Sequence, residues 1–180
     1  MRLPYLRVAN VQPGRLDLTE VKEVEVEPAA AARSELRVGD VLMTEGGDID
    51  KLGRGSVWRG EIARCLHQNH VFAVRPDPKA LDSDYLANVT RTSYARAYFE
   101  STGVQSTNLA STNASKVADF GVPLLPVSAQ RQKCIAFERA ADPLLRAEEG
   151  LRAQVLLLAE HRQSLITSAT ALGPRSNRPA

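Results

Sequence analysis

The sequence has few of the features that mark membrane, secreted and metal-binding proteins. No apolar run approaches the roughly 18–20 residues that a membrane span needs, and no signal-peptide pattern opens the chain. The two cysteines, Cys65 and Cys134, are isolated and lack metal-ligand spacing, so neither a disulfide framework nor a zinc site is expected. These absences favour a cytoplasmic protein that makes no contact with a membrane.

A strong excess of charge is also missing. The 180 residues carry a net charge of +2, which is too small to imply binding to nucleic acid by itself. A basic surface would therefore have to come from local clustering. With 43% hydrophobic and 24% charged residues, the composition is globular. The length suits one ordinary domain, or a modest domain with an extended arm.

Recognisable nucleotide-binding and metal-binding motifs are absent as well. Residues 44–55 form a glycine-rich loop in which glycine allows tight turns or the close approach of a ligand. The loop lacks Walker and dinucleotide spacings, and a plain surface loop remains the alternative. His67 and His70 have no acidic or cysteine ligand at a recognised spacing, so we expect a structural or hydrogen-bonding role for them. No nucleophile is positioned beside them, which disfavours an independent enzyme.

Short strand patterns fill much of the first 126 residues. Alternating or apolar segments bounded by Gly and Pro predict strands at 5–11, 21–26, 41–43, 57–58 and 70–75. Residues 29–37 suit one or two helical turns, and a helix is expected from Asp82 to Glu100 with Asp82 or Ser83 as its cap. We therefore expect an α+β fold in which residues 1–126 form a small, strand-rich head.

Two parts of the head carry side chains that suit contacts with phosphates or bases. Arg91, Tyr94 and Arg96 place cations and an aromatic ring close together, although a solvated helix end is the plainer interpretation. Residues 101–115 are rich in Ser, Thr and Asn, which cap turns and also bond to phosphates and base edges. Composition alone does not separate these uses.

The last quarter of the chain has the clearest periodicity. An arm of this length, continuing about eight helical turns, is too long to pack only on its own head, so pairing with another subunit is expected. Apolar residues recur every seventh position, and Val155 with two alanines fills a companion seam. The residues expected to form the dimer contact are Phe137, Leu144, Leu151, Val155, Leu158 and Leu165.

Proline and glycine set the limits of this arm. The segment Pro123–Pro126 separates it from the head, and Ser128 is a good N-cap. Asp142-Pro143 suits a kink or the start of a new helix. Gly173-Pro174 ends the pattern, which gives a helical arm at 127–173 and a flexible tail at 174–180.

Two polar residues, Glu148 and Arg162, interrupt the companion seam. In a parallel, in-register homodimer, like charges would face each other in a desolvated seam, which is unfavourable. An antiparallel partner centred near Val155 would instead bring the opposite charges into the same neighbourhood. We therefore expect the arm to form an antiparallel coiled coil.

Taken in order, several segments resemble the DNA-specificity subunit of type I restriction–modification systems. Each segment is short, but their order and spacing are fairly specific, and together they cover nearly the whole chain except its last residues. The similar segments are Tyr5–Gln12, Gly14–Leu18, Gly39–Asp48, Lys51–Gly55, His67–Phe72, Thr107–Ala110, Pro123–Pro126, Gln130-Arg131 and Arg162–Ile166.

The resemblance implies a non-catalytic subunit whose target-recognition domain reads one half of a split target in double-stranded DNA. It also implies that the helix acts as an antiparallel spacer and docks the modification methyltransferase subunit, with the restriction subunit joining through the complex. S-adenosylmethionine and ATP would bind to those partners, so this chain needs no cofactor or metal. The sequence agrees, because it contains no Asn-Pro-Pro-Tyr methylase motif, Walker loop or nuclease constellation.

The chain departs from the family pattern in two ways. Full members carry two recognition domains and two helices, whereas this chain has one of each, and its first strand begins almost at Met1. The chain is then a half-subunit that homodimerises or pairs with another half-subunit, or a fragment of a longer protein. A coiled-coil scaffold without DNA binding is the alternative function.

The resemblance and the local chemistry together suggest DNA contacts. Lys and Arg would mainly neutralise phosphates, while Asn and Thr suit base edges. The residues expected to contact DNA are Thr44, Glu45, Lys51, Arg54, Arg91, Tyr94, Arg96, Thr107 and Asn108.

Overall fold

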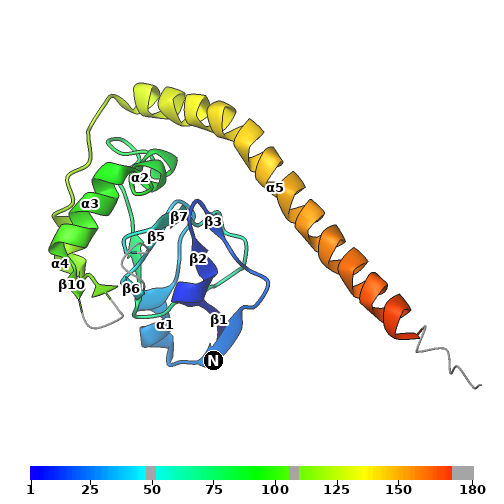
Figure 1. The fold of residues 1–180 in the computed structure, drawn as a ribbon. Helices are drawn as coiled ribbons and strands as arrows, with labels where there is room; N and C mark the ends of the chain where they lie inside the picture. The colour runs from blue at the N-terminus through cyan, green and yellow to red at the C-terminus, as the bar shows by residue number, and fades with distance from the viewer. Residues whose placement is uncertain (48–51, 106–109, 172–180) are drawn as a thin grey trace, which may run out of the picture. The chain divides into compact units, whose positions relative to one another are not determined.

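The computed structural model describes residues 1–47, 52–105 and 110–171. The chain divides into two compact units, Met1–Cys134 and Ile135–Ala180. The first unit contains the head and the beginning of the long helix, and the second contains the rest of that helix (Figure 1). Helices and strands are mixed along the first unit, so the predicted α+β class is confirmed.

Short strands form four small sheets in the first unit. In two of them the central strands are β1 and β5: β1 pairs antiparallel with β4 and parallel with β8, and β5 pairs antiparallel with β7 and β9. The other two have the orders β2-β3 and β10-β11-β6. The strands are β1 (Arg2–Leu6), β2 (Val11–Gln12), β3 (Arg15–Leu16), β4 (Lys22–Glu25), β5 (Val41–Thr44), β6 (Gly46–Gly47), β7 (Gly55–Val57), β8 (Leu66–His67), β9 (Val71–Val74), β10 (Val104–Gln105) and β11 (Ala110–Ser111).

The predicted strand at 5–11 is wrong in its second half. The chain leaves β1 after Leu6 and makes a 3-10 turn, η1 (Val8–Asn10), before β2 begins. Asn10 is buried, and its side chain accepts a hydrogen bond from the Arg7 N–H and donates to the carbonyl oxygens of Asp17 and Glu20. A buried amide requires such partners, and these bonds hold the chain in a turn that a continuous strand would not allow.

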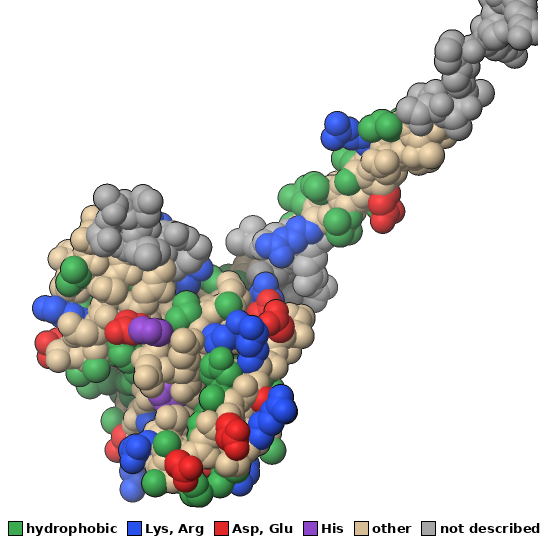
Figure 2. All heavy atoms as spheres, turned by 90° about the horizontal axis from the view of Figure 1, so that it is seen from below, with side chains coloured by type: hydrophobic (Ala, Val, Ile, Leu, Met, Phe, Trp, Pro, Cys, Tyr) green, Lys and Arg blue, Asp and Glu red, His purple; other side chains and the backbone are tan. Residues whose placement is uncertain are grey.

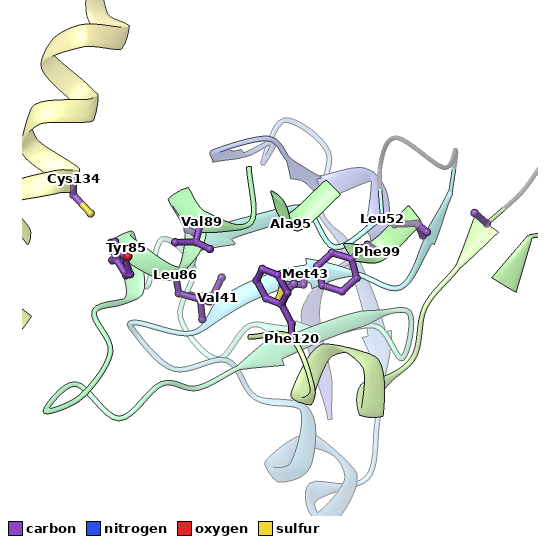
Figure 3. Packing of buried hydrophobic residues seen from close by; sticks show 12 residues of the cluster. Val41, Met43, Leu52, Tyr85, Leu86, Val89, Ala95, Phe99, Phe120 and Cys134 are labelled. Atoms are coloured by element: carbon purple, nitrogen blue, oxygen red, sulfur yellow. The ribbon is translucent and has the colours of Figure 1, made fainter. Parts of the chain in front are cut away.

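The main core lies between β5 and the helices that follow it. All four residues of β5 are buried, and Val41 and Met43 point into a cluster that includes Leu86, Phe99 and Phe120 (Figure 3). The rings of Tyr98, Phe99 and Phe120 contact one another there in tilted or edge-to-face arrangements, with centroids 5.2 Å apart for Phe99 and Phe120. A strand buried on both faces reads as a continuous apolar run, which is why the sequence pattern found β5.

The predicted helix from Asp82 to Glu100 is wrong as one element, because two helices occupy this region, α2 (Ser83–Val89) and α3 (Ser93–Thr102). The Thr90 hydroxyl donates to the carbonyl oxygen of Ala87, while the Thr92 hydroxyl accepts from the Ala95 N–H as the cap of α3. Threonine side chains that bond to the backbone compete with helix continuation. The predicted cap is confirmed, since the Asp82 carboxylate accepts from the N–H groups of residues 84 and 85.

Two short helices complete the head. Helix α1 (Pro28–Ser34) overlaps the segment 29–37 where one or two helical turns were expected, and it begins with a proline in its first turn, as helices favour. Helix α4 (Ala114–Ala118) is capped by Asn113, whose side chain accepts from the Lys116 N–H. Figure 1 shows α2 and α3 beside the central strands and α1 near the N-terminus.

The long helix α5 (Val127–Ala171) is continuous. A new helix starting at Asp142-Pro143 was one of the expected possibilities, and it is not formed, because Pro143 lies inside α5. Proline removes one helical hydrogen bond, but the flanking residues are rich in Ala, Leu, Arg and Glu, which favour helix on both sides. Among the described residues, no helix is long and apolar enough to cross a membrane.

The first turns of α5 belong to the first unit. Gln130 is fully buried there: its amide donates to the carbonyl oxygens of Ala80 and Leu125 at 2.9 and 2.7 Å, and its oxygen accepts from the Asp82 N–H at 2.8 Å. Cys134 joins the main core from the same helix (Figure 3). The first two turns of α5 are therefore packed against the head, although the sequence assigned them to the arm.

Candidate nucleic-acid interface

The described part of the head has an open groove of about 580 Å³. Its walls come from segments far apart in the sequence: the end of β1 with η1, the β5–β6 segment, the turn between β8 and β9, and β11. Its lining residues are Arg7, Val8, Ala9, Glu45, Gly46, Gln68, His70 and Ser111.

Backbone hydrogen bonds tie these walls together. The Gln68 N–H donates to the Leu6 carbonyl oxygen at 2.8 Å, and the Glu45 N–H donates to the His70 carbonyl oxygen at 3.0 Å. On the other side, the Thr112 N–H donates to the Glu45 carbonyl oxygen at 2.7 Å. The groove is therefore a fixed feature of the fold, held by pairing between its own walls.

The charged side chains of the groove are paired within the protein. His70 Nδ1 lies 2.5 Å from Glu45 Oε2, in hydrogen-bond contact. An Arg7 Nη2 group donates to Glu20 at 3.2 Å. Valine and alanine of η1 add an apolar patch beside these groups. The lining therefore combines donors, acceptors and apolar surface, and its formal charge is balanced.

Two buried polar atoms lack a hydrogen-bond partner in the described part of the chain, Arg7 Nε and Thr112 Oγ1. Arg7 lines the groove, and Thr112 follows the lining residue Ser111. Buried groups without a partner are rare in folded proteins and often lie at functional sites. One of the two orphan atoms therefore belongs to a residue that lines this groove.

Among the residues expected to contact DNA, Thr44 is buried in the structure. It is the last residue of β5, is 2% exposed, and pairs with Val71 of β9. Its side chain therefore lies in the buried central strand and not on the exposed surface of the head. The next residue, Glu45, does reach the groove, but its carboxylate contacts His70.

The cationic residues expected to contact DNA are distributed over the head. The Arg91 guanidinium lies against Gly14, where an added Cβ would come within 2.6 Å of it. Arg96 is exposed on α3 and pairs with Glu100 at 2.6 Å, one helical turn away. The partly buried Arg54 precedes β7. These three arginines do not line the groove.

Tyr94 has a structural contact as well as an exposed surface. Its hydroxyl donates to the Gly121 carbonyl oxygen at 2.9 Å, and its ring packs on Phe120 with centroids 5.5 Å apart. Half of the residue nevertheless remains exposed, at 52%. The predicted contacts Lys51, Thr107 and Asn108 lie outside the described residues.

Two glycines of the glycine-rich loop have packing partners. A Cβ on Gly53 would overlap the ring of Phe99, and one on Gly55 would lie 2.5 Å from the Thr90 hydroxyl oxygen. Gly53 also has a φ of +66°, which side chains rarely adopt. At these two positions the glycines are explained by close contact with α3 and the α2 end, without a ligand.

A uniform basic surface is not visible on the face of the head in Figure 2, where Lys and Arg side chains alternate with Asp and Glu. Within the described ranges, no group of three or more His, Cys, Asp or Glu side chains is arranged to hold a metal ion. Cys65 is buried, and its burial raises the pKa of the thiol to about 11, so it stays protonated and unreactive near neutral pH.

Sequence reasoning missed most of the groove. In the sequence, His67 and His70 stand out as a pair, whereas no pattern assigns a role to the amide of Gln68 between them. Ser111 lies in the Ser-, Thr- and Asn-rich stretch at 101–115, but no local pattern places it or Arg7 beside Gln68, because only long-range strand pairing brings these residues together. The sequence did contain one signal for the groove: the polar side chains of residues 68–70 form a short turn between the strands β8 and β9.

The described part of the arm exposes a row of large apolar side chains. Leu151, Val155, Leu158 and Leu165 are between 58% and 68% exposed, and Phe137 is 42% exposed. Ile135, two residues before Phe137, is also exposed, at 49%. Contiguous exposed apolar surface of this kind marks an interaction site. The side chain of the remaining seam residue, Leu144, lies outside the described part.

Comparison with known proteins agrees with the resemblance seen in the sequence. No protein-family model matches the chain. A putative type I restriction enzyme MjaX specificity subunit from Methanocaldococcus jannaschii is 22% identical over 130 residues, which cover 72% of this chain and 31% of that protein. The crystal structure of the HsdS subunit from Thermoanaerobacter tengcongensis matches with a TM-score of 0.63 and 14% identity, over 100% of this chain and 45% of that one.

The chain thus spans less than half the length of either protein. The sequence match and the structural match point to the same kind of subunit. The resemblance to the specificity subunit of type I restriction–modification systems is therefore confirmed, for a chain that corresponds to a part of such a subunit.

Proposed function

We propose that this chain recognises DNA as one half of a type I specificity subunit, and that it has no catalytic activity of its own. The observation that carries the proposal is the fold match to the HsdS subunit, which extends over the whole chain. The polar side chains that line the groove supply candidate contacts for bases, and the three arginines Arg54, Arg91 and Arg96 supply candidate contacts for phosphates.

The arm would pair with the arm of a second copy, and the head of that copy would read the other half of the target. Two copies joined through α5 place two identical heads on one duplex, which favours a split, inverted-repeat target. The same helix would dock the modification methyltransferase subunit, and the restriction subunit would join through that complex. S-adenosylmethionine and ATP would be bound by these partners.

Co-expression with a type I methyltransferase subunit tests this function. The tagged chain is expected to retain the methyltransferase subunit through purification, and the complex is expected to methylate one DNA sequence. Mapping of methylated sites should return two half-sites in inverted repeat, separated by a spacer. Purification without the methyltransferase subunit, or methylation without sequence preference, would contradict the proposal.

Dimerisation through the arm predicts that substitution of one leucine weakens the dimer and that the same substitution of its neighbour does not. Leu158→Asp places a carboxylate in the apolar seam and is expected to weaken the dimer by at least about a hundredfold. Leu157→Asp is the matched control, because Leu157 is equally exposed, at 63% against 68%, but lies about 100° around the helix. Sedimentation over a range of concentrations measures both. Equal effects of the two variants would contradict the seam.

The same assay reports the orientation of the two helices. In an antiparallel pair Glu148 lies near Arg162 of the other copy, so Glu148→Arg and Arg162→Glu should each weaken the dimer, by roughly tenfold for a partly desolvated pair. The double exchange should restore it. In a parallel pair each single exchange replaces one like-charge pair by another. The single exchanges would then leave the dimer affinity nearly unchanged, and the double exchange would have no loss to restore.

A scaffold without DNA binding is the second candidate, favoured by the balanced charge of the head and the exposed seam. The two functions differ in their response to salt. A specificity subunit should bind duplex DNA with steep salt dependence, because phosphate contacts release counterions. A scaffold should show no binding even at low salt.

A further inference from the structure

We propose that the turn between β8 and β9, residues Gln68–His70, is a base-reading element in which Glu45 orients the imidazole of His70. This inference rests on the proposed DNA-recognition function and assigns it a location. It also gives a role to the His67–His70 segment. This segment lacks the ligand spacing of a metal site, and none of its residues is among those expected from the sequence to contact DNA. Glu45 then becomes a positioning residue that acts on DNA through His70.

The contact with Glu45 selects one tautomer of a neutral His70 ring. An ionised carboxylate only accepts hydrogen bonds, so His70 Nδ1 must carry the hydrogen in its 2.5 Å contact with Glu45 Oε2. In a neutral ring the other nitrogen, Nε2, is then an acceptor. No partner for Nε2 is found in the described part of the chain, and the His70 side chain is 64% exposed. An oriented, exposed acceptor is suited to the exocyclic amine of adenine or cytosine.

The rest of the groove supports contact with bases rather than with phosphates. Phosphate binding depends on an excess of cations, whereas Arg7 is paired with Glu20 and Glu45 lies beside His70. Reading of base edges uses a mixture of donors, acceptors and apolar contacts. Gln68, Ser111 and the Val8–Ala9 patch supply all three kinds within one lining.

The turn is also placed and held as a recognition element requires. Asn69 and His70 are exposed, so they can enter a DNA groove, while the chain on either side is fixed by β8 and β9. The Val71 N–H donates to the Gln68 carbonyl oxygen at 2.9 Å and closes the turn. Side chains on a rigid frame lose little conformational freedom on binding, which favours specificity.

The test is selection of bound sequences from a duplex library with a randomised central segment, using the full chain. His70→Ala is expected to lower discrimination at one position of the half-site by about tenfold, with the other positions and the salt dependence unchanged. Glu45→Gln should alter preference at that same position, because a glutamine amide can donate to Nδ1 and leave Nε2–H as a donor. In the His70→Ala background, Glu45→Gln should have no further effect.

His161→Ala is the control, since His161 is an exposed histidine of α5. Thermal unfolding of each variant separates loss of fold from loss of reading. Suppose that the unmodified chain selects a sequence. If His70→Ala then selects the same sequence with the same discrimination, or lowers the affinity for all sequences equally, the base-reading role of His70 is wrong. The DNA-recognition function would still stand. If the unmodified chain selects no sequence at all, even with a methyltransferase subunit added, the proposed function fails first.

Discussion

The Gly53→Ala variant is expected to lose about 3 kcal/mol of unfolding free energy, from backbone strain and overpacking together. Gly53 has a φ of +66°, and an added Cβ would overlap the ring of Phe99. That ring is fully buried and packs on Tyr98 and Phe120, so it has no room to move away. One methyl group therefore strains the backbone and the centre of the core at the same time.

Urea unfolding followed by circular dichroism measures this effect. Gly150→Ala is the matched control, because Gly150 lies inside α5 and a Cβ there would meet nothing within 4 Å. That change should leave the head unaffected and stabilise the helix by up to about 1 kcal/mol. If Gly53→Ala unfolds at the same urea concentration as the unmodified chain, the packing explanation for this glycine is wrong.

Replacing Gln130 with alanine is expected to destabilise the first unit by about 2–4 kcal/mol, because three hydrogen bonds are lost in a buried place. The carbonyl oxygens of Ala80 and Leu125 and the N–H of Asp82 would all lose their partner. Asp82 is also the cap of α2 and accepts from Arg131 Nε at 3.1 Å, so the damage reaches the start of that helix.

The corresponding control is Gln154→Ala on the exposed part of α5, which should change stability by less than about 0.5 kcal/mol. Thiol labelling gives a local readout. Cys134 is 6% exposed and lies one helical turn after Gln130, so it should react faster with a thiol reagent in Gln130→Ala than in the unmodified chain. Equal labelling rates in the two proteins would show that Gln130 does not hold the start of α5 on the head.

These two variants separate packing from function in segments that carry the family resemblance. Gly53 and Gln130 both lie in such segments, and both have structural explanations in this fold. Similarity to a family at a position is therefore not evidence of DNA contact there. The exposed turn at 68–70 belongs to a similar segment too, but Asn69 and His70 are exposed, which leaves their side chains available for recognition.

Local patterns predicted much of the fold. The apolar run of β5, the carboxylate cap of α2 and the helical periodicity of α5 all depend on residues within one or two turns of each other, so the sequence displays them directly. The misplaced elements have local causes that pattern reasoning overlooked. Asn10 and Thr92 bond to nearby backbone and break the expected strand and helix.

The sequence by itself determined the α+β class, the apolar seam of the arm and the resemblance to a specificity subunit, because each is written in the order of residues along the chain. Only the tertiary structure decided which residues share a surface. Pairing of β1 with β8 and of β6 with β11 brings Arg7, Gln68 and Ser111 to one groove, while Thr44 is buried one residue before Glu45 reaches it. Such contacts depend on long-range strand pairing, which no window of neighbouring residues contains.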